Sequence, residues 1–215
     1  ANAARQDLRL DTWPGAEAQA AAIADDIAYD AHDLDDGLRA GLLSVEQIRE
    51  VPFFKDILDE VDARYPDLEE PRRIHEIVRR SITRMVEDVI EESVRRLTAL
   101  APRSVEDIRA ASGAVVSFSE GMTASERSVK AFLFANLYRH DSVLAVRKQV
   151  AAIVRDLFAA YMETPSLMPE EWHRDLRPDE PDRLARRVCD FVAGMTDRFA
   201  VDEHRRLFDH TPDLG

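Results

Sequence analysis

The most chemically suggestive part of the sequence lies in residues 24–41. If this stretch is helical, at about 100° per residue, then Asp25, Tyr29 and Asp33 stack along one side at positions i, i+4 and i+8. Two carboxylates and a phenol on one surface could bind a metal ion and a polar substrate. The competing interpretation is a solvated acidic face, which is common in a protein whose formal net charge is −13.

These residues cannot hold a divalent ion by themselves. Asp25 and Asp33 would lie about 12 Å apart along a helix axis, whereas a divalent ion needs ligands at about 2.0–2.6 Å. Further ligands must therefore come from other elements. The single cysteine, Cys189, excludes an intrachain disulfide and a cysteine-based zinc site, and its apolar helical surroundings predict a core position.

Two other sets of residues are weaker candidates for binding a nucleotide. Arg73 and Arg80 lie on one stripe of a long predicted helix, where they could bind a triphosphate or single-stranded nucleic acid. A solvated face paired with glutamates of the same helix is the favoured alternative. Tyr138 and His140, at the end of another predicted helix, could line a base or phosphate pocket. The sequence contains no Gly-rich phosphate loop and no GxSxG motif.

The elements that must position these residues are helices. Apolar residues recur at helical spacing over 16–40, 52–66, 71–100, 123–140, 141–161 and from 181 onward. This pattern places Ile82, Val146 and Val150 among the inward-facing residues. Residues 113–122 form the only stretch that could be extended. The pattern therefore predicts an all-α fold with at most one short extended segment.

Cap residues and prolines predict where these helices begin and end. Ser44, Ser104 and Thr123 each open a capping-box sequence, in which a hydroxyl and an acidic or amide side chain satisfy the first backbone N–H groups. Pro71 suits the first turn of the long helix, and Pro102 ends it.

Composition limits the classes of protein that remain. The 215 residues suffice for one domain, 1–215, with a real core. Asp and Glu outnumber Lys and Arg by 42 to 29, which disfavours nucleic acid as a general partner, including a helical DNA-binding regulator. No run of about 18 apolar residues and no signal segment occurs, so we expect a cytoplasmic protein without a membrane span.

Three segments of the sequence resemble a known family. Residues 17–43 read EAQAAAIADDIAYDAHDLDDGLRAGLL, residues 71–90 read PRRIHEIVRRSITRMVEDVI, and residues 189–208 read CDFVAGMTDRFAVDEHRRLF. The first segment closely resembles the deoxyguanosine triphosphate triphosphohydrolase-like branch of the HD-domain phosphohydrolases, and the other two are similar to segments of the same family. The resemblance touches both ends and the middle, so it covers nearly the whole chain.

The resemblance implies an HD-domain-like multi-helix bundle that hydrolyses deoxynucleoside triphosphates to the deoxynucleoside and inorganic triphosphate. Family members hold a divalent metal with a histidine, an adjacent His-Asp pair and a distant aspartate, which matches Asp25. Tyr29 matches the tyrosine that packs against the deoxyribose, and Asp33 matches the carboxylate that contacts the sugar hydroxyl. The family also implies homo-oligomers and leaves Mg, Mn, Fe and Co open as the metal.

The sequence departs from the family pattern because no His-Asp pair precedes Asp25. We therefore interpret the chain as the C-terminal portion of a larger enzyme. It would supply Asp25 as a metal ligand and Tyr29 and Asp33 as sugar contacts, without a catalytic residue of its own. Alone, it is expected to bind the metal weakly and to be inactive. The alternative is a non-catalytic helical binding or regulatory module that keeps the HD-type fold.

Overall fold

The computed structural model describes residues 7–176, 180–208 and 211. Across these residues all regular elements are helical and no strand occurs, which confirms the all-α fold class. The chain divides into two compact units, Ala1–His140 and Asp141–Gly215, and each has its own hydrophobic core. The single domain expected from the sequence stays a prediction. None of the helices in the described ranges has the length and apolarity needed to cross a membrane.

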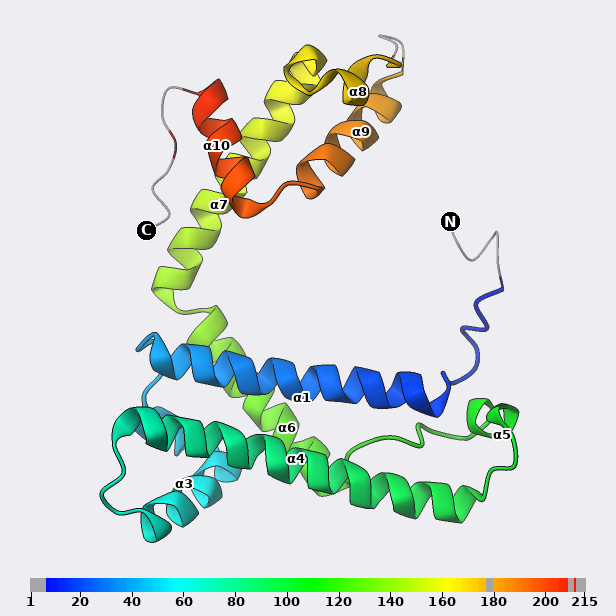
Figure 1. Ribbon diagram of the computed structural model, residues 1–215, viewed down its shortest axis with the longest axis vertical. Coiled ribbons are helices and arrows are strands. Elements are labelled where there is room, and N and C mark those ends of the chain that lie inside the picture. The colour runs from blue at the N-terminus through cyan, green and yellow to red at the C-terminus, as the bar shows by residue number, and fades with distance from the viewer. Residues whose placement is uncertain (1–6, 177–179, 209–210, 212–215) are drawn as a thin grey trace. The chain divides into compact units, whose positions relative to one another are not determined.

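The first unit is built around two long helices that lie side by side (Figure 1). Its elements are α1 (Ala16–Arg39), α2 (Val45–Ile48), α3 (Pro52–Arg64), α4 (Glu70–Leu100), α5 (Val105–Arg109), α6 (Glu120–Leu133) and the π-helix η1 (Phe134–Tyr138). The apolar stripe of α1, which includes Ile27 and Leu34, is buried in one core with Ile77 and Met85 of α4. Helix α3 also packs on α4, and α6 contacts both α1 and α3.

The starts of the short helices follow the predicted caps at two of three positions. Ser44 and Ser104 form capping boxes with Gln47 and Asp107, as predicted. The third prediction, Thr123, is wrong, because α6 begins at Glu120 and is capped by Ser119. A tertiary contact between Asp88 of α4 and Ser119 explains the shift.

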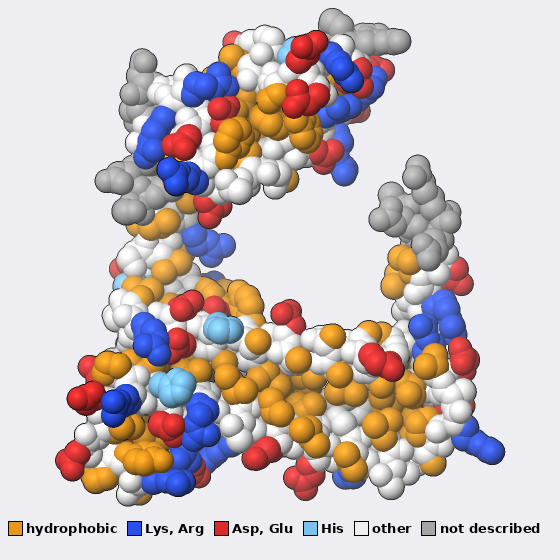
Figure 2. All heavy atoms as spheres, in the orientation of Figure 1, with side chains coloured by type: hydrophobic (Ala, Val, Ile, Leu, Met, Phe, Trp, Pro, Cys, Tyr) orange, Lys and Arg blue, Asp and Glu red, His pale blue; other side chains and the backbone are white. Residues whose placement is uncertain are grey.

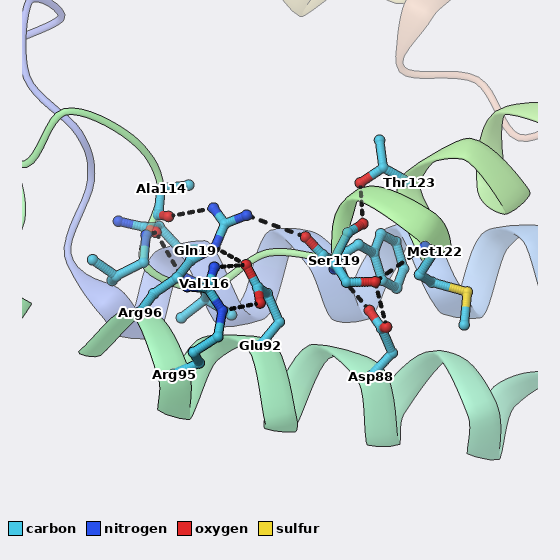
Figure 3. A network of polar contacts seen from close by, with 12 residues as sticks. Gln19, Asp88, Glu92, Arg95, Arg96, Ala114, Val116, Ser119, Met122 and Thr123 are labelled. Atoms are coloured by element: carbon cyan, nitrogen blue, oxygen red, sulfur yellow. Dashed lines mark hydrogen bonds and ion pairs between the residues drawn. The ribbon is translucent and has the colours of Figure 1, made fainter. Parts of the chain in front are cut away.

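Asp88 of α4 fixes the start of α6 (Figure 3). Its carboxylate accepts hydrogen bonds from the Ser119 backbone N–H at 2.8 Å and from the Ser119 hydroxyl at 2.6 Å. The same hydroxyl oxygen accepts from the backbone N–H of Met122 at 3.1 Å, which caps the helix. A side chain 31 residues earlier in the sequence therefore decides where α6 begins.

The segment before α6 is irregular rather than a strand. Its backbone bonds to side chains of α1 and α4 instead of to a neighbouring strand (Figure 3). The Gln19 carbonyl oxygen accepts from the N–H groups of Val115 and Val116 at 2.8 and 3.1 Å. Arg96 donates to the carbonyl of Ala114 at 2.8 Å. These contacts satisfy backbone groups that a sheet would otherwise have to pair.

The second unit comprises α7 (Asp141–Glu163), the short 3-10 helix η2 (Pro165–Leu167), α8 (Glu170–His173), α9 (Pro181–Ala193) and α10 (Asp197–Leu207). Its core gathers Leu157 and Tyr161 of α7 with Val188 and Phe191 of α9. Tyr161 packs edge-to-face on Phe191, with ring centroids 5.3 Å apart, and its hydroxyl donates to Glu203 of α10 at 2.8 Å.

Four predicted core positions are wrong. Ile82, Val146, Val150 and Cys189 are all exposed. On α4 the apolar face is wider than the surface that α1 and α3 cover. In α7 the other helices of the second unit pack on its C-terminal half, near Leu157, and leave the valines of its first half uncovered.

Candidate functional site

Helix α1 presents the predicted D-x3-Y-x3-D residues on the side away from its buried stripe. Leu34 and Ile27 anchor the helix in the core, so the side chains half a turn away project outward. Asp25 is exposed, Tyr29 is 58% exposed, and Asp33 is half-buried. The three residues therefore share a helix face, as the spacing predicts, but they differ in what surrounds them.

Tyr138 and Asp33 meet across the first unit. The Tyr138 hydroxyl donates a short hydrogen bond to the Asp33 carboxylate, although the two residues lie 105 positions apart. Tyr138 ends η1, and a π-turn of this kind, which is frequent at functional sites, inserts an extra residue and changes the direction in which side chains point. Burial raises the pKa of Asp33, and the nearby charge of Asp36 raises it further.

A pocket of about 410 Å³ opens beside this pair, between α1 and the α6–η1 segment. Its walls include the rings of Tyr29, Phe134 and Tyr138, and Asp30 and Lys130 complete its polar lining. The Phe134 and Tyr138 rings lie edge-to-face with centroids 6.4 Å apart. A largely apolar pocket of this size with a few polar groups is typical of a small-molecule site.

Asp30 is a residue that the sequence did not single out. It is only 4% exposed, and its Oδ2 atom accepts no hydrogen bond within the described part of the chain. Burial raises the pKa of Asp30 to about 6, although the Lys130 ammonium opposes that rise. The available signal was its position directly after Tyr29, where the helix turns toward the core.

Lys130 was also missed, although it is one of only three lysines in the chain. Its ammonium pairs with Glu126, one turn earlier on α6, and lies 3.3 Å from Asp26 of α1. Asp30 and Asp33 add to these two carboxylates, so the surroundings of the pocket are more acidic than basic even though the Arg139 guanidinium lies 4.6 Å from the centre of the Phe134 ring.

The arginine stripe of α4 lies away from this pocket and is neutralised by α3. Arg73 donates two hydrogen bonds to Asp62, at 2.9 and 2.8 Å. Arg80 donates to Glu60 at 3.2 Å and lies 3.4 Å from Glu76. The expectation that acidic side chains neutralise this arginine face fits the structure, but most of these acidic partners lie on α3 rather than on α4 itself. The stripe therefore presents no excess positive charge to a triphosphate.

His140 lies two residues beyond the end of η1, and its backbone N–H donates to the carbonyl of Leu137 at 3.1 Å. The residue is half-buried and does not belong to the pocket lining. Of the two candidates at this helix end, the structure brings Tyr138 into the site and leaves His140 beside it.

Comparison with known proteins adds to this geometry. Residues 116–206 match the family described as the phosphohydrolase-associated domain. The deoxyguanosinetriphosphate triphosphohydrolase-like protein of Brucella anthropi is 57% identical over 98% of this chain and 52% of its own length. Proteins of the same name from Azorhizobium caulinodans and Mesorhizobium japonicum are 51% and 52% identical, over 100% and 98% of this chain and 53% and 52% of their own lengths.

Over nearly its whole length this chain is similar to deoxyguanosinetriphosphate triphosphohydrolase-like proteins. It spans about half the length of these relatives. The resemblance seen at Asp25, Tyr29 and Asp33 is therefore part of a similarity that runs through nearly all of the chain.

The described residues do not by themselves form a site for the divalent metal that the resemblance in sequence implies. Within the described ranges, no group of three or more histidine, cysteine, aspartate or glutamate side chains gathers closely enough to bind a metal ion. Asp25 is exposed and does not line the pocket of Tyr29 and Tyr138. The role of Asp25 as a ligand stays a prediction that depends on donors from elsewhere.

Proposed function

We propose that this chain forms the nucleoside-binding part of a metal-dependent deoxynucleoside triphosphate triphosphohydrolase that acts on dGTP-like substrates. The products would be the deoxynucleoside and inorganic triphosphate. The observation that carries the proposal is the hydrogen bond from Tyr138 to Asp33 beside the Tyr29 pocket. The match to the phosphohydrolase-associated domain and the similarity to the Brucella anthropi protein support the phosphohydrolase class.

Each side chain of the pocket has a role that follows from its chemistry. The Tyr29 ring would pack on the deoxyribose, where a 2′-hydroxyl would clash, so the pocket would select deoxy over ribo substrates. The Asp33 carboxylate would accept a hydrogen bond from the 3′-hydroxyl, and Tyr138 holds that carboxylate in place. The Phe134 ring would pack against the base.

The charges around the pocket explain why other groups are needed for turnover. Asp26, Asp30 and Glu126 surround the ammonium of Lys130, and with Asp33 they outnumber that ammonium and the Arg139 guanidinium on the Phe134 ring, so a triphosphate entering here meets repulsion. We expect Asp25 to supply one ligand to a divalent ion, Mg, Mn, Fe or Co, whose other ligands lie outside the described residues. Such an ion would supply neutralisation of phosphate charge and activation of water. Alone, the chain is expected to be inactive. A homo-oligomeric, cytoplasmic protein is part of the same proposal.

Binding of the α-thio analogue of dGTP tests the nucleoside pocket without requiring turnover. Tyr29→Ala is expected to weaken binding about tenfold, which corresponds to about 1.4 kcal/mol, and to reduce the preference for dGTP over GTP. Tyr65→Ala, which removes an exposed tyrosine that does not line this pocket, is the matched control. Equal affinities in both variants, measured by calorimetry, would contradict the pocket assignment.

Triphosphate release from dGTP with added Mn²⁺ tests the enzymatic part. A fusion of this chain to the half of a relative that the chain does not match should turn over substrate, whereas the chain alone should not. Robust turnover by the chain alone would disprove its dependence on outside ligands.

The second candidate function is a non-catalytic helical module, and the exposure of Asp25 favours it. Asp25→Ala in the longer protein separates the two candidates. Loss of bound metal and of activity supports the enzyme, and unchanged metal content supports the module. Asp56→Ala, at an exposed position of α3, controls for loss of charge.

A further inference from the structure

A second concave surface of the first unit lies on the other side of α1 from the nucleoside pocket. It is a groove of about 270 Å³ between α1 and α4. Figure 2 shows apolar side chains along it, as a band that follows the two helices. The nucleoside proposal gives this groove no role.

The α4 side of the groove exposes more apolar surface than a solvent-facing helix needs. Ile82, Val86, Ile90 and Val94 follow one another at every fourth position, and their exposure ranges from 38% at Ile82 to 59% at Val94. β-Branched residues are mediocre helix formers, so helix propensity does not explain them on a solvated face. A contiguous apolar patch of this kind marks an interaction surface.

The α1 side of the groove is shaped for close approach. Ala20, Ala24 and Ala28 also recur at every fourth position and line the groove opposite Ile82, Val86 and Ile90. Small side chains on one wall and a ridge of larger ones on the other leave room for a third helix at about 8–10 Å from its neighbours. An amphipathic helix laid in a two-helix groove is a common mode of recognition.

The rims of the groove are acidic on both sides. Asp25 and Asp36 lie exposed along the α1 rim, and Glu87 and Glu91 lie exposed along the α4 rim. None of these four carboxylates has an ion-pair partner among the described residues. A second copy of this same face would bring like charges together, which disfavours a symmetric dimer through the groove. The surface instead favours a helix whose apolar face is flanked by Lys or Arg.

We propose that the α1–α4 groove is the docking surface for an amphipathic helix with basic flanks. This helix belongs to the part of the relatives' sequences, about half of their length, to which this chain does not align. The groove offers an unpartnered apolar face, and the relatives contain roughly as much additional chain again. The inference holds whether that half is joined to this chain or is a separate polypeptide. It requires neither metal binding nor hydrolysis.

Thermal unfolding of two proteins tests the docking surface. One is this chain alone, and the other is this chain joined to the unmatched half of the Brucella anthropi relative. Ile90→Glu should lower the Tm of the joined protein by about 5 °C or more, because it places a charge in a buried contact. In the chain alone, the same variant should shift the Tm by no more than about 2 °C. Val105→Glu, at an exposed valine of α5, should have little effect on either protein.

A second measurement covers the case in which the joined variant fails to fold. The unmatched half is expressed separately and mixed with the chain, and sedimentation velocity follows the complex. Ile90→Ala should weaken the complex about tenfold, and the charge reversal Glu87→Lys should weaken it less. The proposal is overturned if Ile90→Glu affects both proteins equally or neither. It is also overturned if the variant only dissolves a dimer of the chain with itself.

Discussion

Among single residues, Asp30 has the least favourable surroundings for its charge. The carboxylate is buried beside the nucleoside pocket, and one of its oxygens has no hydrogen-bond partner in the described part of the chain. Among the charges that act on this carboxylate, Lys130 is positive, while Asp26, Asp33 and Glu126 are negative. Burial favours the neutral acid, which explains why its pKa is raised.

Asp30 should therefore make the folded protein less stable as the pH rises, which is the opposite of what a carboxylate with a lowered pKa does. Its pKa is about 6 in the folded protein and 3.8 as the reference for the unfolded chain, so the folded state binds more protons between these values. Stability should fall by about 2–3 kcal/mol as the pH rises from about 4 to 6, relative to a chain without this group. Asp30→Asn should remove that component and raise stability at pH 7 by about 1–2 kcal/mol.

Urea unfolding at a series of pH values measures this dependence. Asp25→Asn, at an exposed position of α1 whose charge is not among those acting on Asp30, is the matched control and should leave the dependence between pH 4 and 6 in place. If Asp30→Asn has the same pH profile as the unaltered chain, Asp30 is ionised at no cost and the assignment is wrong.

At the level of elements, the position of α6 depends on side chains rather than on its own sequence. α6 and η1 carry Lys130 and Tyr138 into the site. Their starting point is set by Asp88 through Ser119, and the preceding segment is held by Gln19 and Arg96. A substitution that shifts the start of α6 should therefore also move Lys130 and Tyr138 in the pocket.

Asp88→Ala should lower the free energy of unfolding by about 1–2 kcal/mol, because the Ser119 N–H and hydroxyl lose a charged acceptor. Glu87→Ala, at the exposed neighbouring position, should change it by less than about 0.5 kcal/mol. A double-mutant cycle with Ser119→Ala, followed by urea unfolding, should show strong non-additivity. Simple additivity would show that the two residues act independently.

At the scale of the whole molecule, the two units have separate cores and carry one tryptophan each. Trp13 precedes α1 in the first unit, and its backbone N–H donates to the backbone carbonyl of Arg109 at 3.0 Å. Trp172 lies in α8 and packs on Phe191 of α9, with ring centroids 5.1 Å apart. Each unit therefore has its own fluorescent probe.

Leu157→Ala should destabilise the second unit alone. Leu157 is fully buried in the core of that unit, so its truncation should cost about 2–5 kcal/mol. In a Trp13→Phe background, the remaining Trp172 fluorescence should report an earlier unfolding midpoint. In a Trp172→Phe background, the Trp13 signal should not move. Leu133→Ala in the first core should give the reverse pattern, and equal shifts of both probes would show that the units unfold together.

The sequence by itself determined most helices and the face on which the candidate residues lie. Periodicity located α1, α3, α4, α7 and α9, because apolar spacing near 3.6 residues per turn is a local property of the chain. The same local geometry aligned Asp25, Tyr29 and Asp33, and the quoted segments were sufficient to recognise the family.

Only the tertiary structure decided which of these faces is covered and which residues meet. The bond between Tyr138 and Asp33, the burial of Asp30 and the pairing of Arg73 with Asp62 all join elements or surfaces that spacing along one helix cannot relate. The apolar spacing of α4 also placed Ile82 in the core, because spacing along one helix cannot show which residues a neighbouring helix covers. Its apolar side chain shows that it prefers a buried environment, but whether a neighbour covers it depends on packing between distant parts of the chain.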